Sequence, residues 1–241
     1  MIQETELQPE KAYVFLTDGV EFGASIFPDK YYQFSYENGN LKSVIGRLSS
    51  NNQFVPNVTT LLSYSPNKVV VDYMESMGSY TTISYSMENN RPKKAEQYFN
   101  GDTSYLFFSK TYSYEQDKIK IYTKRGSIEY YTTYYFDTKN NLIKKEVLEK
   151  TGGMDNKFTT TAYSDFDNAK NPFKKLYLIN DDFYEKSLSA NNFRAKESVS
   201  QYLPNPANGN MTYPPGHSSS QWTYHYDANG QVLLYFPLPV Q

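Results

Sequence analysis

The chain has 241 residues, and its 24 basic and 26 acidic side chains give a formal net charge of -2. Because these charges are balanced and scattered, they exclude the dense positive surface that nucleic acids and anionic membranes require. The absence of cysteine excludes thiolate nucleophiles, cysteine zinc sites and iron–sulfur clusters. Mean hydropathy is only -0.70, but aromatic residues make up 17% of the chain, and buried rings can replace the missing aliphatic residues of a core. We therefore expect a folded protein.

Two explanations fit the start of the chain. Residues 1–12 are predicted to be a polar N-terminal linker, and residues 13–241 a single domain. No stretch has the 18 or more apolar residues of a membrane span, and no signal-peptide core follows Met1. The protein is either cytosolic, or a mature exported protein whose leader is missing from the sequence.

A short repeat recurs along the chain. Each copy begins with an aromatic or aliphatic residue, one intervening residue of any type, and an aromatic residue. A polar turn follows, and then an aliphatic or β-branched run. Its copies cover residues 34–41, 62–69, 83–92, 112–119, 134–142 and 224–232. Alternate residues of a strand point to the same face, so each copy predicts a β-hairpin. Gly39 and Gly230 are predicted turn residues, because they supply a positive φ without a Cβ penalty.

The first five copies follow one another at intervals of about 20–30 residues, which fits two strands and two connections. The β-branched and aromatic runs between them, such as Val69-Val70-Val71, disfavour helix. We therefore predict an all-β fold, a twisted antiparallel β-meander of consecutive hairpins. The pattern lapses at about residues 164–220, which we interpret as an irregular C-terminal insertion with one short helix at residues 181–188.

The segment Tyr224-His225-Tyr226-Asp227, followed by Asn229-Gly230 and Val232, resembles the YD repeats of RHS-type proteins. The degenerate copies, together with residues 163–173 and 187–192, are similar to YD-like lipoproteins of Bacteroides-type bacteria, a family known as domain of unknown function 4595. This resemblance covers most of the chain from about Tyr31. It implies a twisted β-meander, export to the periplasm or outer cell surface, and a lipid anchor on a cysteine upstream of the sequence given. The family has no assigned reaction, so it supplies no catalytic residues.

The sequence offers little for metal, cofactor or general acid–base chemistry. His217 and His225 are its only histidines and make a poor metal set, so we expect no metal and no cofactor. Asp165, Asp167 and Asn168 could hold Ca²⁺, but the loop lacks the glycine and terminal glutamate of a calcium loop. Asx turns explain the same three residues, and this interpretation is favoured.

The tyrosine excess is the remaining clue. Most tyrosines are interpreted as packing between hairpins. Trp222, Tyr213 and Tyr224 are the candidate ligand-binding residues, because the only tryptophan follows a Pro/Gly/Ser loop, and binding residues concentrate on such loops.

We therefore expect a monomeric, exported, non-enzymatic binding or structural module, with a glycan or a protein as its ligand and no nucleic-acid partner. Two alternatives stay open: a glycoside-type hydrolase with an acidic groove, and a pure structural spacer. A carboxylate pair in an enclosed pocket would favour the hydrolase, an open aromatic groove a binding protein, and a featureless sheet the spacer.

Overall fold

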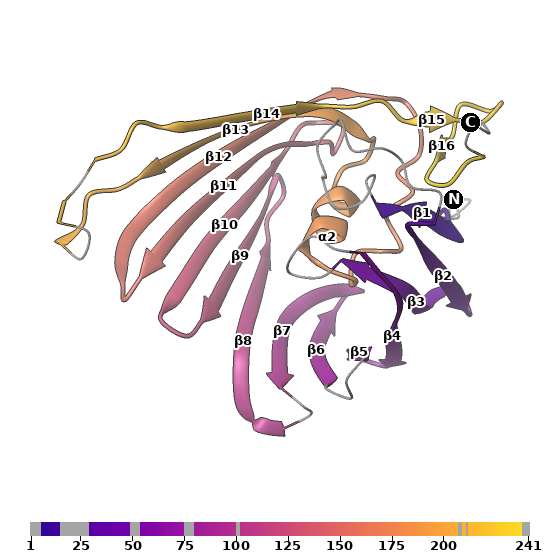
Figure 1. Ribbon diagram of the computed structural model, residues 1–241, viewed down its shortest axis with the longest axis horizontal. Helices are drawn as coiled ribbons and strands as arrows, with labels where there is room; N and C mark the ends of the chain where they lie inside the picture. Colours follow the sequence, from indigo (N-terminus) through magenta and orange to yellow (C-terminus); the bar gives the residue numbers. More distant parts are fainter. Residues whose placement is uncertain are drawn as a thin grey trace.

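The computed structural model of the protein describes residues 6–14, 29–48, 54–74, 80–99, 102–206, 209–210 and 212–237. Most of these residues form antiparallel strands around one short helix (Figure 1). The strands are β1 (Lys11–Tyr13), β2 (Tyr31–Glu37), β3 (Asn40–Leu48), β4 (Phe54–Ser65), β5 (Lys68–Met74), β6 (Tyr80–Glu88), β7 (Arg91–Phe99), β8 (Asp102–Tyr114), β9 (Lys118–Arg125), β10 (Ile128–Phe136), β11 (Leu142–Thr151), β12 (Met154–Phe166), β13 (Phe193–Tyr202), β14 (Gly216–Gln221), β15 (His225–Tyr226) and β16 (Val232–Leu233). The helix is α2 (Asp181–Leu188).

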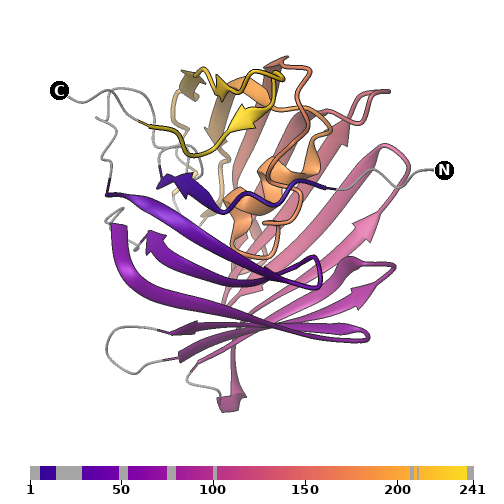
Figure 2. The ribbon, with the colours of Figure 1, turned by 90° about the vertical axis from the view of Figure 1, so that its right-hand side faces the viewer.

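Strands β1 to β14 lie in one sheet in the order of the sequence, and each pairs antiparallel with the next. Figure 2 shows that this sheet is curled, so that its concave face surrounds the helix. Each repeat copy forms a hairpin: five lie within the large sheet, and the sixth is the separate pair β15–β16. The predicted all-β meander with one short helix is confirmed.

The hairpin turns follow the local chemistry of the repeat. In the β2–β3 turn, Asn38 has a φ of 51° and Gly39 a φ of 78°. In the β15–β16 turn, Gly230 has a φ of 76°. These positive values are rare for residues with a Cβ, other than asparagine and aspartate, and both glycines therefore sit where their type is favoured.

The range predicted as an irregular insertion, residues 164–220, is mostly outside the strands, but it is not irregular throughout. Strand β12 continues to Phe166, and β13 and β14 add two further strands. These strands are rich in serine and charged residues and lack the aromatic pair of the repeat, so the pattern missed them. Only residues 167–192, which we call the interior segment, leave the sheet between β12 and β13.

The predicted linker, residues 1–12, is likewise not a free tail where it is described. Strand β1 begins at Lys11, and the Tyr36 hydroxyl donates to the carbonyl oxygen of Pro9 at 2.9 Å. Residues 1–5 lie outside the described part of the chain. Polar composition suggested a linker, but the backbone at these positions pairs with the sheet.

The interior segment builds the core. Asn180 caps α2 by accepting a hydrogen bond from the Phe183 backbone nitrogen at 2.9 Å. Phe183 is fully buried, and its ring contacts those of Tyr32 and Phe34 edge-on at 5.6 and 6.2 Å. Tyr184 points to the other side, where its ring lies 5.7 Å from that of Tyr112. One turn of helix thus fills the space between β2 and β8.

After β14 the chain returns to the first strand. The Tyr13 backbone nitrogen donates to the Leu234 carbonyl oxygen at 2.9 Å, and the Tyr13 hydroxyl donates to that of Phe236 at 2.9 Å. The C-terminal segment therefore covers the outer edge of β1. Figure 1 shows β15 and β16 beside β1.

Candidate functional site

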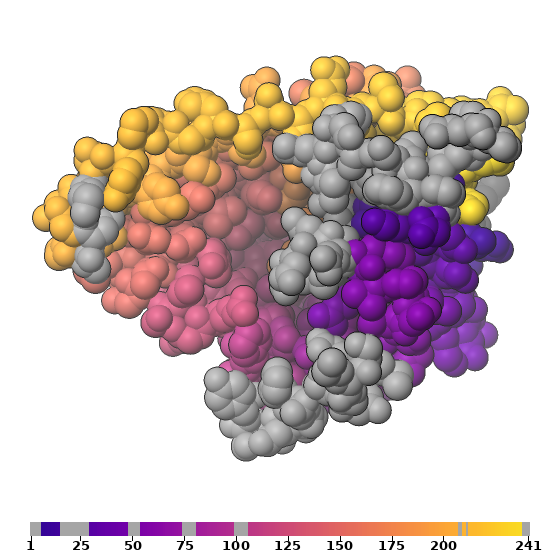
Figure 3. Space-filling model, viewed as in Figure 1, coloured from indigo at the N-terminus to yellow at the C-terminus, as the bar shows by residue number. Residues whose placement is uncertain are grey.

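The concave face carries a groove beside the N-terminal end of α2. One cavity of about 630 Å³ lies between strands β5–β11 and the helix. A second cavity of about 370 Å³ continues it toward β3 and shares Tyr73, Ile83 and Asn180 with the first. We call the two cavities together the groove. In the space-filling view, the middle of this side is recessed, with the pink and salmon strands at its floor (Figure 3).

The length of the groove suits a chain-like ligand. It runs across the strands from β3 to β11. Neighbouring strands lie about 4.8 Å apart, so eight intervals span roughly 38 Å along the curved sheet. A small molecule could occupy one of the two cavities, whereas a chain-like ligand could extend through both.

Aromatic and hydroxyl side chains from consecutive strands make up the floor. Tyr130, Thr132 and Tyr134 alternate along β10 and all line the larger cavity. Thr123 and Ile121 line it from the neighbouring strand β9. This alternation places the intervening residues, such as Tyr131, on the convex face, where Tyr131 is 43% exposed. The groove is thus built from the period-2 pattern of β9 and β10.

Paired charges tie the helix to the floor. Lys110 on β8 forms an ion pair with Asp181, and Lys145 on β11 forms one with Glu185. Both carboxylates belong to α2, and all four residues line the larger cavity. The Tyr73 hydroxyl adds a third tie by donating to the Ile179 carbonyl oxygen at 2.5 Å. The larger cavity therefore presents balanced charge, because its lining contains three cations and three carboxylates: Lys110, Arg125, Lys145, Asp181, Asp182 and Glu185.

The tyrosines deepest in the groove are held neutral. Burial raises the pKa of Tyr134 well above its ordinary value, and the nearby carboxylates of Glu185 and Asp181 raise it further. Burial likewise raises the pKa of Tyr85. At neutral pH these hydroxyls therefore remain protonated and act as hydrogen-bond donors or acceptors without charge.

The structure brings the side chains of Trp222 and Tyr224 together but places Tyr213 elsewhere. Trp222 is half-buried: its ring lies 5.8 Å from that of Phe193, and the Lys186 ammonium lies 5.1 Å above it. Tyr224 is buried in the core at 6% exposure. Tyr213 is 47% exposed, and its ring contacts that of Tyr202 edge-on at 5.6 Å.

The separation follows from the length of β13. The Trp222 backbone nitrogen bonds to the Arg194 carbonyl oxygen at one end of the strand, whereas Tyr202 ends it. At about 3.3 Å per residue, eight residues separate these positions by roughly 26 Å. The three residues therefore do not form the single platform that was predicted. Tyr213 lies at one end of the β13–β14 hairpin and Trp222 at the other.

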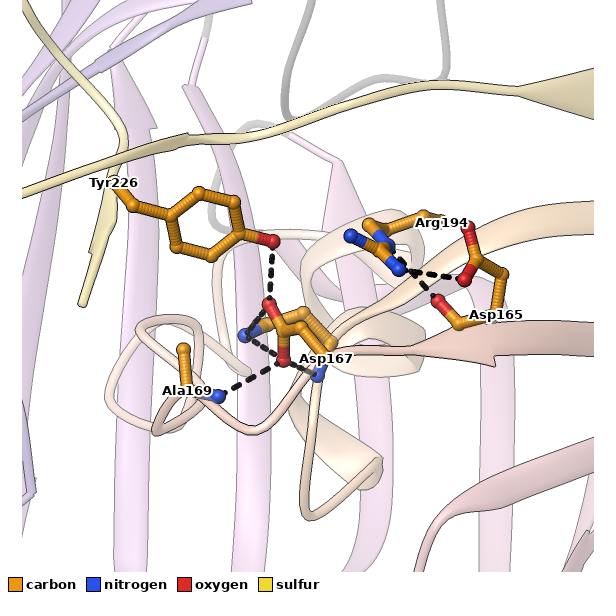
Figure 4. A network of polar contacts seen from close by, with 6 residues as sticks. Asp165, Asp167, Ala169, Arg194 and Tyr226 are labelled. Atoms are coloured by element: carbon orange, nitrogen blue, oxygen red, sulfur yellow. Dashed lines mark hydrogen bonds and ion pairs between the residues drawn. The ribbon is translucent and has the colours of Figure 1, made fainter. Parts of the chain in front are cut away.

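The acidic cluster that could hold Ca²⁺ is occupied by hydrogen-bond donors from the protein (Figure 4). The Asp167 carboxylate accepts bonds from the backbone nitrogens of Ala169 and Asn192 at 3.2 and 3.0 Å. It also accepts bonds from the Asn192 amide and, at 3.1 Å, from the Tyr226 hydroxyl. Asp165 forms an ion pair with Arg194 at 2.6 Å. Among the described residues, no group of three or more histidine, aspartate and glutamate side chains could hold a metal ion.

Distinctive motif residues hold the interior segment in place. The amide of Asn171 donates to the carbonyl oxygens of Lys186 and Ser189, at 2.7 and 2.8 Å. The Ser189 hydroxyl accepts a bond from the Leu142 backbone nitrogen, just after the β10–β11 turn. The Asn191 backbone nitrogen donates to the Asn141 side chain of the same turn at 2.9 Å. These residues bind other parts of the chain, and their role is scaffolding.

The other residues singled out from the sequence lie away from the groove. His225 is exposed and stacks on Phe236 with ring centroids 3.8 Å apart, and His217 lies on the exposed edge strand β14. Within the described residues, no helix has the length and apolar character needed to cross a membrane.

Sequence reasoning missed the groove residues Lys110, Tyr130, Thr132 and Lys145. Their strands were predicted, and alternation gave the two faces of each strand. No feature of the sequence within a strand indicated which of its two faces would meet α2. The acids at the start of the predicted helix were the only signal, and their partners lie on strands up to 71 residues away.

The sequence matches no protein-family model and no curated protein. Among solved structures, the chain is similar to a porin-like protein from Bacteroides vulgatus, with a TM-score of 0.51 and 10% identity over 83% of this chain and 87% of that one. It is also similar to a porin-like protein from Bacteroides uniformis, with a TM-score of 0.49 and 14% identity over 84% of this chain and 79% of that one. At these identities the first likeness shows the fold alone.

Proposed function

We propose that this protein is an exported, non-enzymatic binding module that holds a neutral glycan chain in the concave groove. The observation that carries the proposal is the groove itself: a long, open depression whose floor alternates tyrosine rings with threonine hydroxyls. Sugar rings present both apolar C–H faces and hydroxyl groups, and such a floor matches both.

The charge pattern supports a neutral ligand. Lys110 and Lys145 each pair with a carboxylate of α2, and the larger cavity is lined by as many carboxylates as cations, so it lacks the excess of cations that a polyanion would require. Hydroxyl groups of a sugar can bond to both members of such a pair without removing either charge from its partner.

The hydrolase alternative rests on the three carboxylates of Asp181, Asp182 and Glu185, which all line the larger cavity. Two of them are bound to lysines, and the cavity is open rather than enclosed, which favours binding over cleavage. The spacer alternative predicts a featureless sheet, and the groove argues against it.

An exported location, in the periplasm or at the outer cell surface, is part of the proposal. The fold likeness to a porin-like protein of Bacteroides supports it. So does the resemblance to YD-like lipoproteins, whose motif residues here anchor the interior segment. Kinship with that family and a lipid anchor upstream of Met1 are proposed on the same grounds.

The test is affinity electrophoresis of the purified protein in gels containing starch, xylan, yeast mannan or dextran. We expect retardation by at least one of these polysaccharides. Tyr130→Ala, which removes a ring from the groove floor, should weaken that binding at least tenfold, or about 1.4 kcal/mol. Tyr131→Ala is the matched control, because it removes the neighbouring ring from the convex face.

Three results would contradict the proposal. One is no retardation by any of the four polysaccharides. Another is equal binding by the wild type and Tyr130→Ala. The third is release of reducing sugar from a polysaccharide that binds, which would establish the hydrolase instead.

A further inference from the structure

A single row of side chains leads from the groove to an exposed part of the concave face. Backbone pairing places Tyr130 opposite Glu149, Glu149 opposite Lys157, and Lys157 opposite Tyr202. Tyr130 lies on the groove floor and Tyr202 at the far end of β13. Three strand intervals of about 4.8 Å separate them by roughly 14 Å.

A second row runs parallel to the first. Thr132 pairs with Val147, Val147 with Thr159, and Thr159 with Ser200. The hydroxyls of Thr159 and Ser200 bond to each other at 2.9 Å. Two residues further along each strand, the hydroxyls of Thr161 and Ser198 also bond to each other, at 2.8 Å. Thr161 is buried, so this face of the strands is the one that packs on the core. Both rows therefore lie on the concave face. We call Lys157, Thr159, Ser200, Tyr202 and Tyr213 the shelf.

The shelf ends in a pair of exposed rings. Tyr202 is 44% and Tyr213 47% exposed, and their rings meet edge-on at 5.6 Å. The Lys157 ammonium lies 5.4 Å from the centre of the Tyr202 ring. An edge-on pair leaves ring surface open to a ligand.

We infer that the shelf is a second subsite for the same glycan chain, so that the protein reads a length of polymer rather than one sugar unit. This inference rests on the proposed function of the groove. The same kinds of side chain continue from the groove to the shelf: hydroxyl groups flanked by tyrosine rings. The charge of Lys157 is balanced by Glu149, its partner on the neighbouring strand. A folded protein partner would require a broader apolar area than one pair of adjacent rings.

The test compares a disaccharide with an octasaccharide, both prepared from the polysaccharide that retards the wild type in the gel assay, by isothermal titration calorimetry. Tyr213→Ala and Tyr202→Ala should each weaken octasaccharide binding about tenfold and leave disaccharide binding unchanged. Tyr213→Phe, which keeps the ring, should retain wild-type affinity for both. Because both residues are exposed, the melting temperatures should match that of the wild type.

The outcomes separate the two proposals. If Tyr130→Ala weakens binding of both sugars but the shelf variants bind the octasaccharide as the wild type does, the shelf inference is wrong and the groove remains. Equal affinity of the wild type for the disaccharide and octasaccharide would also overturn the shelf. If Tyr130→Ala has no effect on either sugar, the groove itself is not the site.

Discussion

The two sides of the interior segment differ in how their polar groups are used. On the side of Asp167, Asn171 and Ser189, carboxylate, amide and hydroxyl groups bind backbone groups of neighbouring turns. On the side of the groove, the hydroxyls of Thr123 and Thr132 line an open cavity. The first side resembles the interior of a stable protein, and the second resembles a binding surface.

This difference separates stability from function within one curled sheet. Buried polar groups that are fully bonded fix a single arrangement, and losing one partner is costly. Side chains at an open cavity contribute less to folding, so their identity can serve a ligand. The predictions below test this division, beginning with the largest effect.

Alkaline pH should unfold the protein. Burial raises the pKa of five tyrosines well above the ordinary value of about 10. They are Tyr85, Tyr112, Tyr134, Tyr163 and Tyr184. The unfolded chain loses these protons above pH 10 while the folded chain keeps them, so stability is full below pH 10 and falls as the pH rises from there.

One buried cation opposes this trend at lower pH. Burial lowers the pKa of Lys174 to about 8, so the folded chain releases that proton before the unfolded chain does. Stability should therefore rise slightly from pH 8 before it falls above pH 10. Far-ultraviolet circular dichroism should lose its β signal in the same pH range in which tyrosinate absorbance rises. Complete tyrosine ionisation near pH 10 with an unchanged β signal would show that these hydroxyls are not buried.

Phe183→Ala should cost about 3–5 kcal/mol of unfolding free energy, because it leaves a cavity among rings on β2 and the interior segment. Phe183 is 0% exposed, and its ring contacts those of Tyr32, Phe34 and Phe173. Phe158→Ala on the convex face removes a ring that is 37% exposed and should cost less than about 1 kcal/mol. Urea denaturation of both variants measures the contrast, and equal losses would mean that α2 does not fill the core.

Gly39→Val and Gly230→Val should each destabilise the fold by about 1–3 kcal/mol through backbone strain at positive φ. No atom lies within 4 Å of a Cβ built at Gly230, so crowding cannot account for a loss there. Gly216→Val, where φ is not in the positive range, is the control and should cost less. Unchanged thermal midpoints for both turn variants would refute the hairpin register.

The hairpins could be predicted from sequence because their determinants are local. Asn38-Gly39 fixes a turn, and the spacing of Phe34 and Tyr36 fixes a face. Strands β13 and β14 escaped prediction because serine and charged residues carry no such pattern, and their pairing depends on bonds such as Thr159 to Ser200, 41 residues apart. The groove escaped for the same reason: it exists only where α2 meets strands that come much earlier in the chain.

The smallest expected effect concerns the groove floor. Tyr130→Ala should cost less than about 1 kcal/mol of stability, although the substitution removes a whole ring, because Tyr130 borders an open cavity rather than a packed core. If the division between the two sides holds, this variant keeps its melting temperature and loses its glycan. A Tyr130→Ala variant that unfolds like Phe183→Ala would place Tyr130 in the core and show that its ring is not part of an open groove floor. Thermal denaturation monitored by circular dichroism, run beside the gel assay on the same preparation, decides between these outcomes.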